Sequence, residues 1–376
     1  MIKILFIHRR MDCGGVEQAL FDLINLMDKS LFDITVLLQQ EGGAWEHKFL
    51  DAGIRLTHVY DCQKSSHNPV VKGMNFIKRI RLECAWKQNG RGALNVALPE
   101  NFDIVVKYGA ITFDDMCFHR NAKTIQYIHG DINTNMSYRD YILKRTKLLP
   151  RFDRIICVSE QAHSSFVEQT GISEHVTTLY NPLDTEKIKL LAKQKNDLPT
   201  GLPLICAVGR LSEEKGFVRL IRIHKSLLDK GYLHRLVLVG DGEERLQIEN
   251  TIQQTETQES VILTGYQENP YPYMTQSDFL VCSSYTEGLP VIAMEALSLG
   301  IPIVSSVPSI GEIFGSEQCG IITQNDDSSL EAGIERMLTD KDFYHAAKQA
   351  AKIRSQFFNG KNMVQKTEIL YSKLLN

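Results

Sequence analysis

The sequence predicts an α/β protein built from two doubly wound domains, each with a parallel sheet covered by helices on both faces. Short runs of β-branched and aliphatic residues alternate with longer amphipathic stretches along most of the chain. This alternation is typical of β-α-β units, which form parallel sheets. The chain has 376 residues, which is too long for one core of ordinary size, and the alternation restarts at Leu204. Two such domains are therefore expected.

The first domain is predicted from apolar runs that have the length of buried strands. These strands are expected at Ile2–Ile7, Ile34–Leu38, Ile104–Val106, Thr124–Ile128 and Ile155–Val158. Val16–Met27 separates the first two and has apolar residues at helical spacing, which indicates a crossover helix. The second domain repeats the pattern, with a helix over Phe217–Asp229 after its first strand. Its strands are expected at Leu204–Val208, Arg235–Val239, Ser260–Leu263, Phe279–Cys282 and Ile301–Ser305.

The boundary between the domains is placed after the segment Thr178–Asp184. A polar, lysine-rich segment, Thr185–Leu198, follows it. A helix and loop inside one domain would also explain this segment, but the restart of the strand–helix pattern favours a linker. The expected organisation is a first domain over residues 1–183 and a second over 184–360. Residues 361–376 are expected to form an amphipathic helix, and a two-domain arrangement allows that helix to pack back on the first domain.

The composition is that of an ordinary soluble globular enzyme, with 43% apolar and 23% charged residues. The net charge of -3 argues against nucleic acid as the main partner. The eight cysteines lack metal-ligand spacing, and several lie in apolar runs, so buried free thiols in a reducing compartment are expected. The first apolar run is too short for a signal peptide, and no run is long enough to cross a membrane. A cytoplasmic protein is expected, with peripheral contact at the inner face of the membrane as the only membrane role.

The most informative stretch is Tyr285–Ser306, which contains two acids, Glu287 and Glu295. Glu287 is expected just before a helix and Glu295 inside it, which would place their α-carbons on the order of 12 Å apart if both were helical. This is too far for a glycosidase acid–base pair, but it suits two anchor points on an elongated ligand. Amides of Gly288 and Leu289 would suit a phosphate at the helix start. The alternative is a capping acid at Glu287 and a buried, paired acid at Glu295.

A loop with a cation near each end follows the first strand of the second domain. It runs from Gly209 to Gly216 and carries Arg210 and Lys215, which are typical phosphate partners. Open parallel sheets bind ligands at such strand–loop–helix junctions. The alternative is a solvated loop in which the neighbouring acids, residues 213 and 214, pair with the cations. Together with the two later acids, the loop suits a ligand that is anionic in its middle and hydroxylated at both ends, such as a nucleotide diphosphate sugar.

Weaker candidates lie at other strand ends. Gly14 and Gly15 form a turn before a helix, where backbone amides favour an anion, although a plain tight turn explains them as well. Gly240, in the sequence Gly-Asp-Gly, fits either a ligand contact or an ordinary turn. His129 follows a strand, where a structural and a cleft-lining role are both open. Tyr266 is a further candidate contact for the base, with core packing as the alternative.

Signals for a metal are weak, because the Asp-x-Asp at residues 340–342 has the pattern of a helix start. Two basic stretches, residues 72–91 and 139–154, interleave cations with apolar residues. Such a segment can lie on an anionic membrane surface, and a solvated helix face would explain the pattern equally well.

Taken together, these motifs resemble the retaining GT-B glycosyltransferases of family four. The N-terminal Gly-Gly loop, the Gly-Arg…Lys-Gly loop, the Gly-Asp-Gly turn and the two acids stand in the order of that family, across nearly the whole chain. The resemblance implies two Rossmann-like domains facing a cleft, with the donor held mainly by the second. Leu289 stands where that family commonly has phenylalanine, which is a mild departure.

The resemblance also implies roles for the residues. Arg210 and Lys215 would hold the diphosphate, Glu295 the ribose hydroxyls and Glu287 the hydroxyls of the donor sugar. His129 would contact the sugar from the acceptor side. The catalytic set would be Glu287, His129, Arg210 and Lys215. The donor-binding set would be Gly14, Gly15, Gly209, Arg210, Lys215, Gly240, Tyr266, Glu287, Gly288, Leu289 and Glu295.

The implied function is the retaining, metal-independent transfer of a hexose or N-acetylhexosamine from a nucleotide sugar, with a UDP-sugar favoured and no cofactor. The expected acceptor is a saccharide or lipid-linked saccharide in the synthesis of cell-surface polysaccharide or glycoconjugates. One alternative is a nucleotide-sugar epimerase on the same architecture, for which the spacing of the two acids is less expected. Another is a catalytically silent nucleotide-sugar-binding subunit of a transferase complex, against which the intact cations and acids argue.

Overall fold

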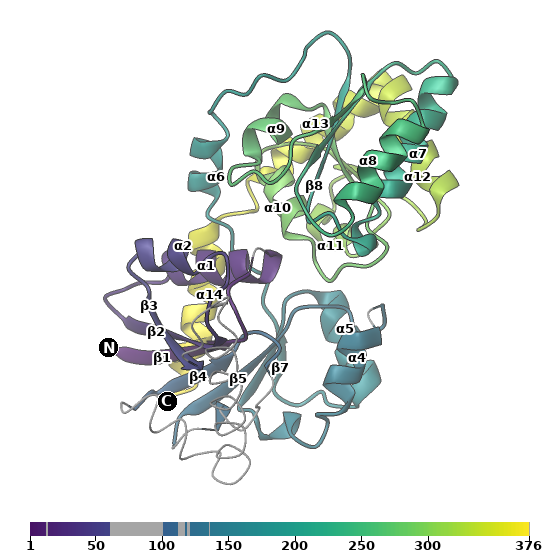
Figure 1. The fold of residues 1–376 in the computed structure, drawn as a ribbon. Helices are drawn as coiled ribbons and strands as arrows, with labels where there is room; N and C mark the ends of the chain where they lie inside the picture. Colours follow the sequence, from purple (N-terminus) through teal and green to yellow (C-terminus); the bar gives the residue numbers. More distant parts are fainter. Residues whose placement is uncertain (13, 61–100, 112–116, 119–120, 135, 376) are drawn as a thin grey trace, which may run out of the picture. The chain divides into compact units, whose positions relative to one another are not determined.

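The computed structural model describes the chain apart from residues 13, 61–100, 112–116, 119–120, 135 and 376 (Figure 1). The chain divides into two compact units. The first unit comprises Met1–Pro182 with Lys361–Asn376, and the second unit comprises Leu183–Gly360. Each unit contains one parallel sheet with helices packed on it, which is the α/β class expected from the alternating patterns.

The first unit is built on a seven-stranded parallel sheet with the order β3-β2-β1-β4-β5-β6-β7. The strands are β1 (Ile2–His8), β2 (Phe32–Gln40), β3 (Arg55–Tyr60), β4 (Ile104–Lys107), β5 (Lys123–Ile128), β6 (Arg154–Cys157) and β7 (Val176–Thr178). The helices are α1 (Gly15–Leu26), α2 (Glu46–Asp51), α4 (Met136–Leu143), α5 (Glu160–Thr170) and α14 (Gly360–Lys373), with a 3-10 turn, η2, at Leu149–Arg151.

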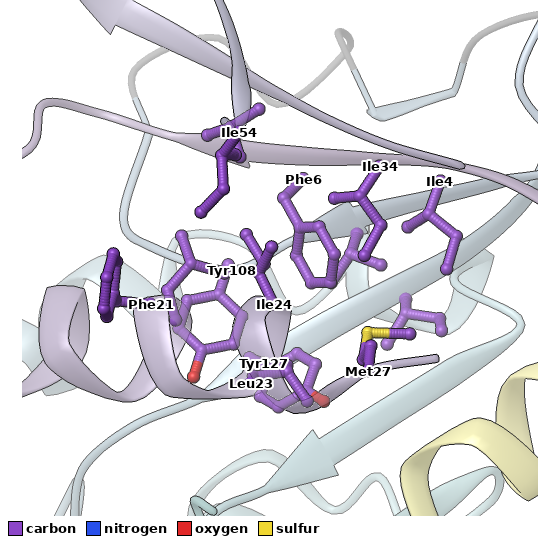
Figure 2. Close-up of a cluster of buried hydrophobic side chains, with 14 of the residues drawn as sticks. Ile4, Phe6, Phe21, Leu23, Ile24, Met27, Ile34, Ile54, Tyr108 and Tyr127 are labelled. Atoms are coloured by element: carbon purple, nitrogen blue, oxygen red, sulfur yellow. The ribbon is translucent and has the colours of Figure 1, made fainter. Parts of the chain in front are cut away.

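Successive residues of β1 point to opposite faces of this sheet, because side chains alternate along a strand. Ile4 and Phe6 join the core that includes α1, part of which Figure 2 shows. Leu5 and Ile7 join the core on the other face, with residues of α4 and α5. Both faces of β1 are therefore buried, which explains why its sequence is a continuous apolar run rather than an alternating one.

Helix α14 belongs to the first unit, although the whole second unit precedes it in the sequence; Figure 1 shows it in yellow. Val364 and Tyr371 are buried in the core around α1, and the Tyr371 hydroxyl lies 3.1 Å from the hydroxyl of Tyr127. The amide of Asp28 donates a hydrogen bond to Glu368 at 2.7 Å. The amphipathic tail thus fills one side of the first core.

The second unit is built on a six-stranded parallel sheet with the order β10-β9-β8-β11-β12-β13. The strands are β8 (Leu204–Val208), β9 (Arg235–Val239), β10 (Val261–Leu263), β11 (Phe279–Cys282), β12 (Ile303–Ser305) and β13 (Gly320–Ile322). The helices are α6 (Thr185–Leu191), α7 (Phe217–Asp229), α8 (Arg245–Gln254), α9 (Tyr271–Gln276), α10 (Val291–Ser298), α11 (Ile310–Phe314), α12 (Asp327–Thr339) and α13 (Lys341–Ser355), with a 3-10 turn, η3, at Glu213–Lys215. Helices α7, α8 and α12 share one core with the sheet.

The structure places β8, β9, β11 and α7 at the bounds that the sequence predicts. Three strands were not predicted: β3, β7 and β13. Each of them lies at an edge of its sheet. An edge strand needs no second hydrogen-bonded neighbour and can be short and polar, which removes the apolar run that identifies a central strand.

The segment after the predicted boundary is not a linker. Its first part forms α6, which begins where the Asp184 carboxylate accepts a hydrogen bond from the amide of Lys187 at 3.1 Å. The side chain of Asn269 donates to the carbonyl of Leu191 at 3.0 Å, and Ile188 is buried, so the helix is tied to the second unit. The linker interpretation is wrong because a good cap and two buried residues, Thr185 and Ile188, suffice to fold this polar sequence.

Five cysteines lie within the described residues, namely Cys117, Cys157, Cys206, Cys282 and Cys319, and all of them are buried free thiols as predicted. Burial raises the pKa of Cys206 and of Cys282 to about 12, which keeps both thiols protonated and unreactive. Among the described helices, none has the length and apolar character needed to span a bilayer.

Candidate functional site

The order of the second sheet reverses between β8 and β11, which are neighbours. Open parallel sheets form a crevice at the carboxyl ends of their strands at such a point, because the loops on the two sides lead away in opposite directions. The loop after β8 carries Arg210 and Lys215, and the loop after β11 carries Glu287. The topology therefore brings together a cation and an acid that lie 72 residues apart in the sequence.

Lys215 forms an ion pair with Glu287, through Nζ and Oε1. The hydroxyl of Ser284 donates to the same carboxylate oxygen at 2.9 Å. The side chains are partly buried, with 23% of Lys215 and 18% of Glu287 exposed. A pocket is lined by all three residues together with Phe217 and Ile292. The acid that engages this cation is thus the distant Glu287 and not one of the acids next to it in the loop.

Arg210 is exposed at the other end of the same loop. Burial of Glu214 raises the pKa of its carboxyl, but the hydrogen bond from Ser212 and the charges of Arg210 and Lys215 outweigh this and hold the pKa below its usual value. The amide of Gly209 donates to the carbonyl of Val239 at 3.0 Å, which fixes the start of the loop on β9. The loop therefore presents one accessible guanidinium and one partly buried ammonium.

Glu287 lies in the loop and not on a helix, since α10 begins only at Val291, after Pro290. The separation expected for two acids on one helix therefore does not apply. Glu287 is also not a helix cap, because the cap position is Pro290 and no side chain caps α10. Leu289 is only 6% exposed, so its aliphatic side chain belongs to the core and only its backbone is placed to meet a ligand. Gly288, between the two, is partly buried.

Glu295 lies within α10 and is 6% exposed. The hydroxyl of Tyr271, at the start of α9, donates to its Oε1 at 3.0 Å. A buried carboxylate without a polar partner would be costly, and this hydrogen bond supplies one. The expectation that an inward acid in an apolar helix needs a partner is therefore met by an aromatic hydroxyl.

Gly240 has a structural reason to be glycine. Its φ of +151° lies in the region that favours glycine, and a Cβ there would come within 1.8 Å of the carbonyl oxygen of Gly209. A Cβ on Gly242 would lie 2.4 Å from the carbonyl oxygen of Leu211. The Gly-Asp-Gly turn thus packs directly on the loop that carries Arg210. Tyr266 is half exposed.

Gly14 and Gly15 lie at the start of α1 in the first unit. The φ of Gly14 is −163°, which is extended backbone that any residue adopts. A Cβ on Gly14 would, however, lie 2.5 Å from Oε2 of Glu17. Glu17 pairs with the buried His8 at 3.1 Å. The Gly-Gly turn therefore makes room for an acid–histidine pair.

His129 follows β5, and its Nε2 lies 2.5 Å from the carbonyl oxygen of Tyr108. Because a carbonyl only accepts, Nε2 must carry the proton and Nδ1 must be an acceptor. Within the described residues, Nδ1 is buried without a hydrogen-bond partner. Desolvation lowers the pKa of His129 to about 3, with the neighbouring His8 as a further cause, although the bond to Tyr108 opposes the shift. His129 is therefore neutral.

The basic stretch at residues 72–91 lies outside the described residues. The stretch at residues 139–154 is not one helix, because it runs through α4 and η2 into the start of β6. The guanidinium of Arg145 lies 3.6 Å from the ring centre of Tyr141, and that of Arg151 lies 4.1 Å from the ring centre of Phe118. Two of its cations are thus engaged with aromatic rings of the first unit.

Comparison with known proteins assigns the family. Residues 13–187 match the family described as Glycosyltransferase Family 4, and residues 189–354 match that described as Glycosyl transferases group 1. The chain belongs to these glycosyltransferases. The resemblance recognised from the motifs is confirmed.

Curated relatives of this glycosyltransferase include an N-acetylgalactosaminyltransferase of Campylobacter jejuni, named for a diphospho-undecaprenol-linked saccharide. It is 25% identical over 92% of this chain and 93% of its own length. An uncharacterized glycosyltransferase of Methanocaldococcus jannaschii is 30% identical, over 45% of this chain and 43% of its own length.

Solved structures support the expected GT-B fold class. HepE of Anabaena, solved in complex with UDP, aligns with a TM-score of 0.74 at 18% identity, covering 99% of this chain and 100% of HepE. Sucrose-phosphate synthase of Thermosynechococcus elongatus aligns with a TM-score of 0.76 at 15% identity, covering 100% of this chain and 99% of the synthase. The two Rossmann-like, parallel-sheet units of this glycosyltransferase are thus those of its structural neighbours.

Sequence reasoning missed Arg219 of the glycosyltransferase, a fully buried cation in the first turn of α7. Its guanidinium binds the loop that carries Glu287. The sequence did contain a signal. Arg219 stands at the head of a row with Ile223 and Leu227 at helical spacing, and a cation in an apolar row needs buried acceptors.

Proposed function

We propose that this glycosyltransferase moves a hexose or N-acetylhexosamine from a nucleotide sugar, preferably a UDP-sugar, to a saccharide acceptor with retention of configuration. The observation that carries the proposal is the ion pair between Lys215 and Glu287, which lies where the order of the second sheet reverses between β8 and β11. Glu295 is buried on the helix that follows, α10. A cation suits the diphosphate of such a donor, and separated carboxylates suit the hydroxyl groups on either side of it.

In this proposal Arg210 and Lys215 hold the diphosphate, Glu287 accepts hydrogen bonds from the hydroxyls of the sugar, and Glu295 accepts them from the ribose. Donor binding then exchanges the Lys215–Glu287 ion pair for two sets of bonds, one from Lys215 to phosphate and one from sugar hydroxyls to Glu287. Each charge-assisted hydrogen bond contributes roughly 1.5–3 kcal/mol. Backbone groups of Gly288 and Leu289 supply further donors to phosphate and sugar.

The chemistry proposed is a front-face displacement. The bond from the anomeric carbon to the diphosphate oxygen breaks, and the acceptor oxygen forms its bond to the same carbon on the same face. The proton of the acceptor hydroxyl passes to an oxygen of the departing diphosphate. Arg210 and Lys215 stabilise the negative charge that develops on the leaving group, so transfer is expected without a metal.

In the first unit, we assign His129 to a hydrogen bond with the transferred sugar and the Gly14–Gly15 turn to the diphosphate. The neutral ring of His129 supports this role, since its Nδ1 is an acceptor that is free for a hydroxyl group among the described residues. A neutral acceptor orients a hydroxyl without adding charge beside the phosphates.

The proposed acceptor is a lipid-linked saccharide that is used in cell-surface polysaccharide or glycoconjugate synthesis at the inner face of the membrane. The Campylobacter jejuni relative supports this, because its name specifies a diphospho-undecaprenol-linked saccharide and a 4-alpha linkage. The UDP complex of the Anabaena neighbour supports the choice of nucleotide. Flotation with anionic and neutral vesicles tests the membrane component, and equal recovery with both would remove it.

Thermal stabilisation by a panel of UDP-, GDP- and ADP-sugars, with EDTA present, tests the donor site. We expect a shift with the UDP-sugars in the wild type and its loss in Glu295→Ala. NMR of the product's anomeric proton then reports whether configuration is retained. The absence of a shift with any nucleotide sugar would contradict the donor site, and an inverted product would contradict the front-face step.

A further inference from the structure

Arg219 is a charged side chain in an unusual position, because only 2% of it is exposed and no carboxylate lies within hydrogen-bond distance among the described residues. Asp327 is 3.9 Å away and is itself 63% exposed. Desolvation lowers the pKa of the guanidinium, which is the sign of a charge taken out of water. A cost of this kind is offset only where the buried charge satisfies several acceptors at once.

Those acceptors belong to one short segment, Ser283–Tyr285. Arg219 donates from Nε to the carbonyl of Ser283 at 2.8 Å and from Nη2 to the carbonyl of Ser284 at 3.2 Å. Its guanidinium lies 4.2 Å from the ring centre of Tyr285. Asn325 completes the set, since it accepts from Nη1 at 2.9 Å and donates to the carbonyl of Tyr285 at 2.6 Å. Arg219 therefore holds the carbonyls of Ser283 and Ser284 directly, and it holds the carbonyl of Tyr285 through the side-chain amide of Asn325.

The same segment carries the contacts of both ionic residues of the donor site. The hydroxyl of Ser284 donates to Glu287 at 2.9 Å, and the hydroxyl of Ser283 donates to the carbonyl of Lys215 at 2.9 Å. Gly216 must be glycine here, because its φ is +65° and a Cβ would lie 2.3 Å from the carbonyl oxygen of Ser283. The loop after β11 is thus fixed against the loop after β8.

We infer that Arg219 is a positioning residue of the glycosyltransferase: it holds Ser283–Tyr285 so that Glu287 is placed to bind the sugar of the donor. This inference rests on the proposed function of Glu287. Arg219 does not itself contact the donor, since its nitrogens are taken by the loop and by Ser306 and Asn325. It acts through the backbone that precedes Glu287. A displacement of about 1 Å at a reacting group can lower a rate on the order of 10²-fold.

The test is Arg219→Lys, which keeps the charge but loses the planar fork of donors. The matched control is Arg354→Lys. Arg354 also donates to backbone carbonyls in the second unit, from Nε to Ile313 at 2.6 Å and from Nη2 to Glu312 at 3.4 Å, but these carbonyls belong to helix α11, which does not carry Glu287. We expect Arg219→Lys to lower kcat for transfer on the order of 10²-fold, and Arg354→Lys to leave kcat within about twofold of the wild type.

Two readouts distinguish positioning from a general loss of stability. Hydrogen exchange should accelerate at the amides of residues 283–287 in Arg219→Lys and not in Arg354→Lys. Arg219→Lys should bind the nucleotide sugar more weakly than the wild type does. Its affinity for the nucleoside diphosphate alone should stay within about twofold, because Arg210 is untouched. In the Glu287→Gln background, Arg219→Lys should cause little further loss.

The role of Arg219 would be overturned if kcat were unchanged in Arg219→Lys. It would also be overturned if the kcat losses of Arg219→Lys and Glu287→Gln multiplied independently in the double variant. Either result would leave the donor site intact. A wild-type protein that binds no nucleotide sugar and transfers none would overturn the proposed function, and the role of Arg219 with it. The two failures are therefore distinguished by the wild type alone.

Discussion

Two charged candidate residues of the second unit, Lys215 and Glu287, bind each other, whereas the candidate histidine of the first unit is neutral and binds backbone. Lys215 and Glu287, on two different loops, form an ion pair. Arg219 binds the carbonyls of Ser283 and Ser284, which precede Glu287 in the chain. In the first unit, His129 is tied to the carbonyl of Tyr108, and Gly14 makes room for Glu17.

This difference teaches how the two halves of such an enzyme divide their work. The anionic donor needs fixed positive charge, and fixed charge must be paired with an acid when no ligand is present. A sugar hydroxyl needs only a neutral donor or acceptor, which His129 would supply in the proposed function. The second unit should therefore respond strongly to changes of charge, and the first unit mainly to changes of shape and of proton uptake.

The largest effect is expected for Glu287→Gln, which removes the charge that pairs with Lys215 and, in the proposed function, binds the sugar. We expect kcat for transfer to fall on the order of 10²–10³-fold. Because Lys215 loses its ion-pair partner, the affinity for the free nucleoside diphosphate should rise. Steady-state kinetics and titration calorimetry measure the two effects. A nucleoside diphosphate that binds more weakly to the variant would contradict the exchange of ion pairs.

Gly240→Ala should come next, with a loss of stability on the order of 3 kcal/mol. The added methyl group meets the carbonyl of Gly209, and the loop that carries Arg210 must move. Gly231→Ala is the matched control, since φ is also positive at +89° there but a Cβ meets nothing within 4 Å. It should lose only about 1 kcal/mol. Urea unfolding measures both, and equal losses would show that the close approach is unimportant.

Tyr271→Phe should lower the stability of the second unit by about 1.5 kcal/mol, because the buried Glu295 loses a hydrogen bond that is 3.0 Å long. The donor should also bind more weakly if Glu295 moves. Tyr273→Phe, on the same helix and only partly buried, is the control. Thermal unfolding with and without a nucleotide sugar separates the two effects. Equal behaviour of the two variants would remove the role of Tyr271.

The last effect concerns His129 and develops only as the pH falls. Its folded pKa of about 3 lies below the unfolded value of about 6.5, so the unfolded chain takes up the proton first as the pH falls. The stability contributed by the neutral ring is complete above about pH 6.5 and is lost towards pH 3, at no more than about 1.4 kcal/mol per pH unit. His129→Gln should flatten this slope in urea unfolding between pH 7.5 and pH 5. An unchanged slope would place the proton uptake elsewhere.

Much of the fold followed from the sequence, because buried parallel strands have continuous apolar runs. The bounds of β8, β9 and β11 were predicted correctly for that reason. Edge strands lack this signal: β7 reads Val-Thr-Thr and is only partly buried. The helix α6 was missed because its sequence is mostly polar and Ile188 is its one buried apolar residue, so tertiary contacts decide the outcome there.

The candidate site was predicted in part. Arg210, Lys215 and Glu287 could be named because charged residues beside glycines are conspicuous. Glu295 could be named because it is a charge in an apolar helix. Their pairing could not be predicted, since the contact between Lys215 and Glu287 depends on the adjacency of β8 and β11. The role of Arg219 depends on backbone carbonyls, which carry no signature in a sequence. The glycine at residue 240 was ambiguous until its distance to Gly209 was known.

The return of α14 to the first unit has a consequence for how the chain is made. The second unit is one continuous segment, Leu183–Gly360, and all of it is translated before Tyr371. The first unit can settle only after that, because Tyr371 and Val364 fill the core around Tyr127. Until α14 is made, the core of the first unit therefore exposes apolar surface, although most of that unit is translated first.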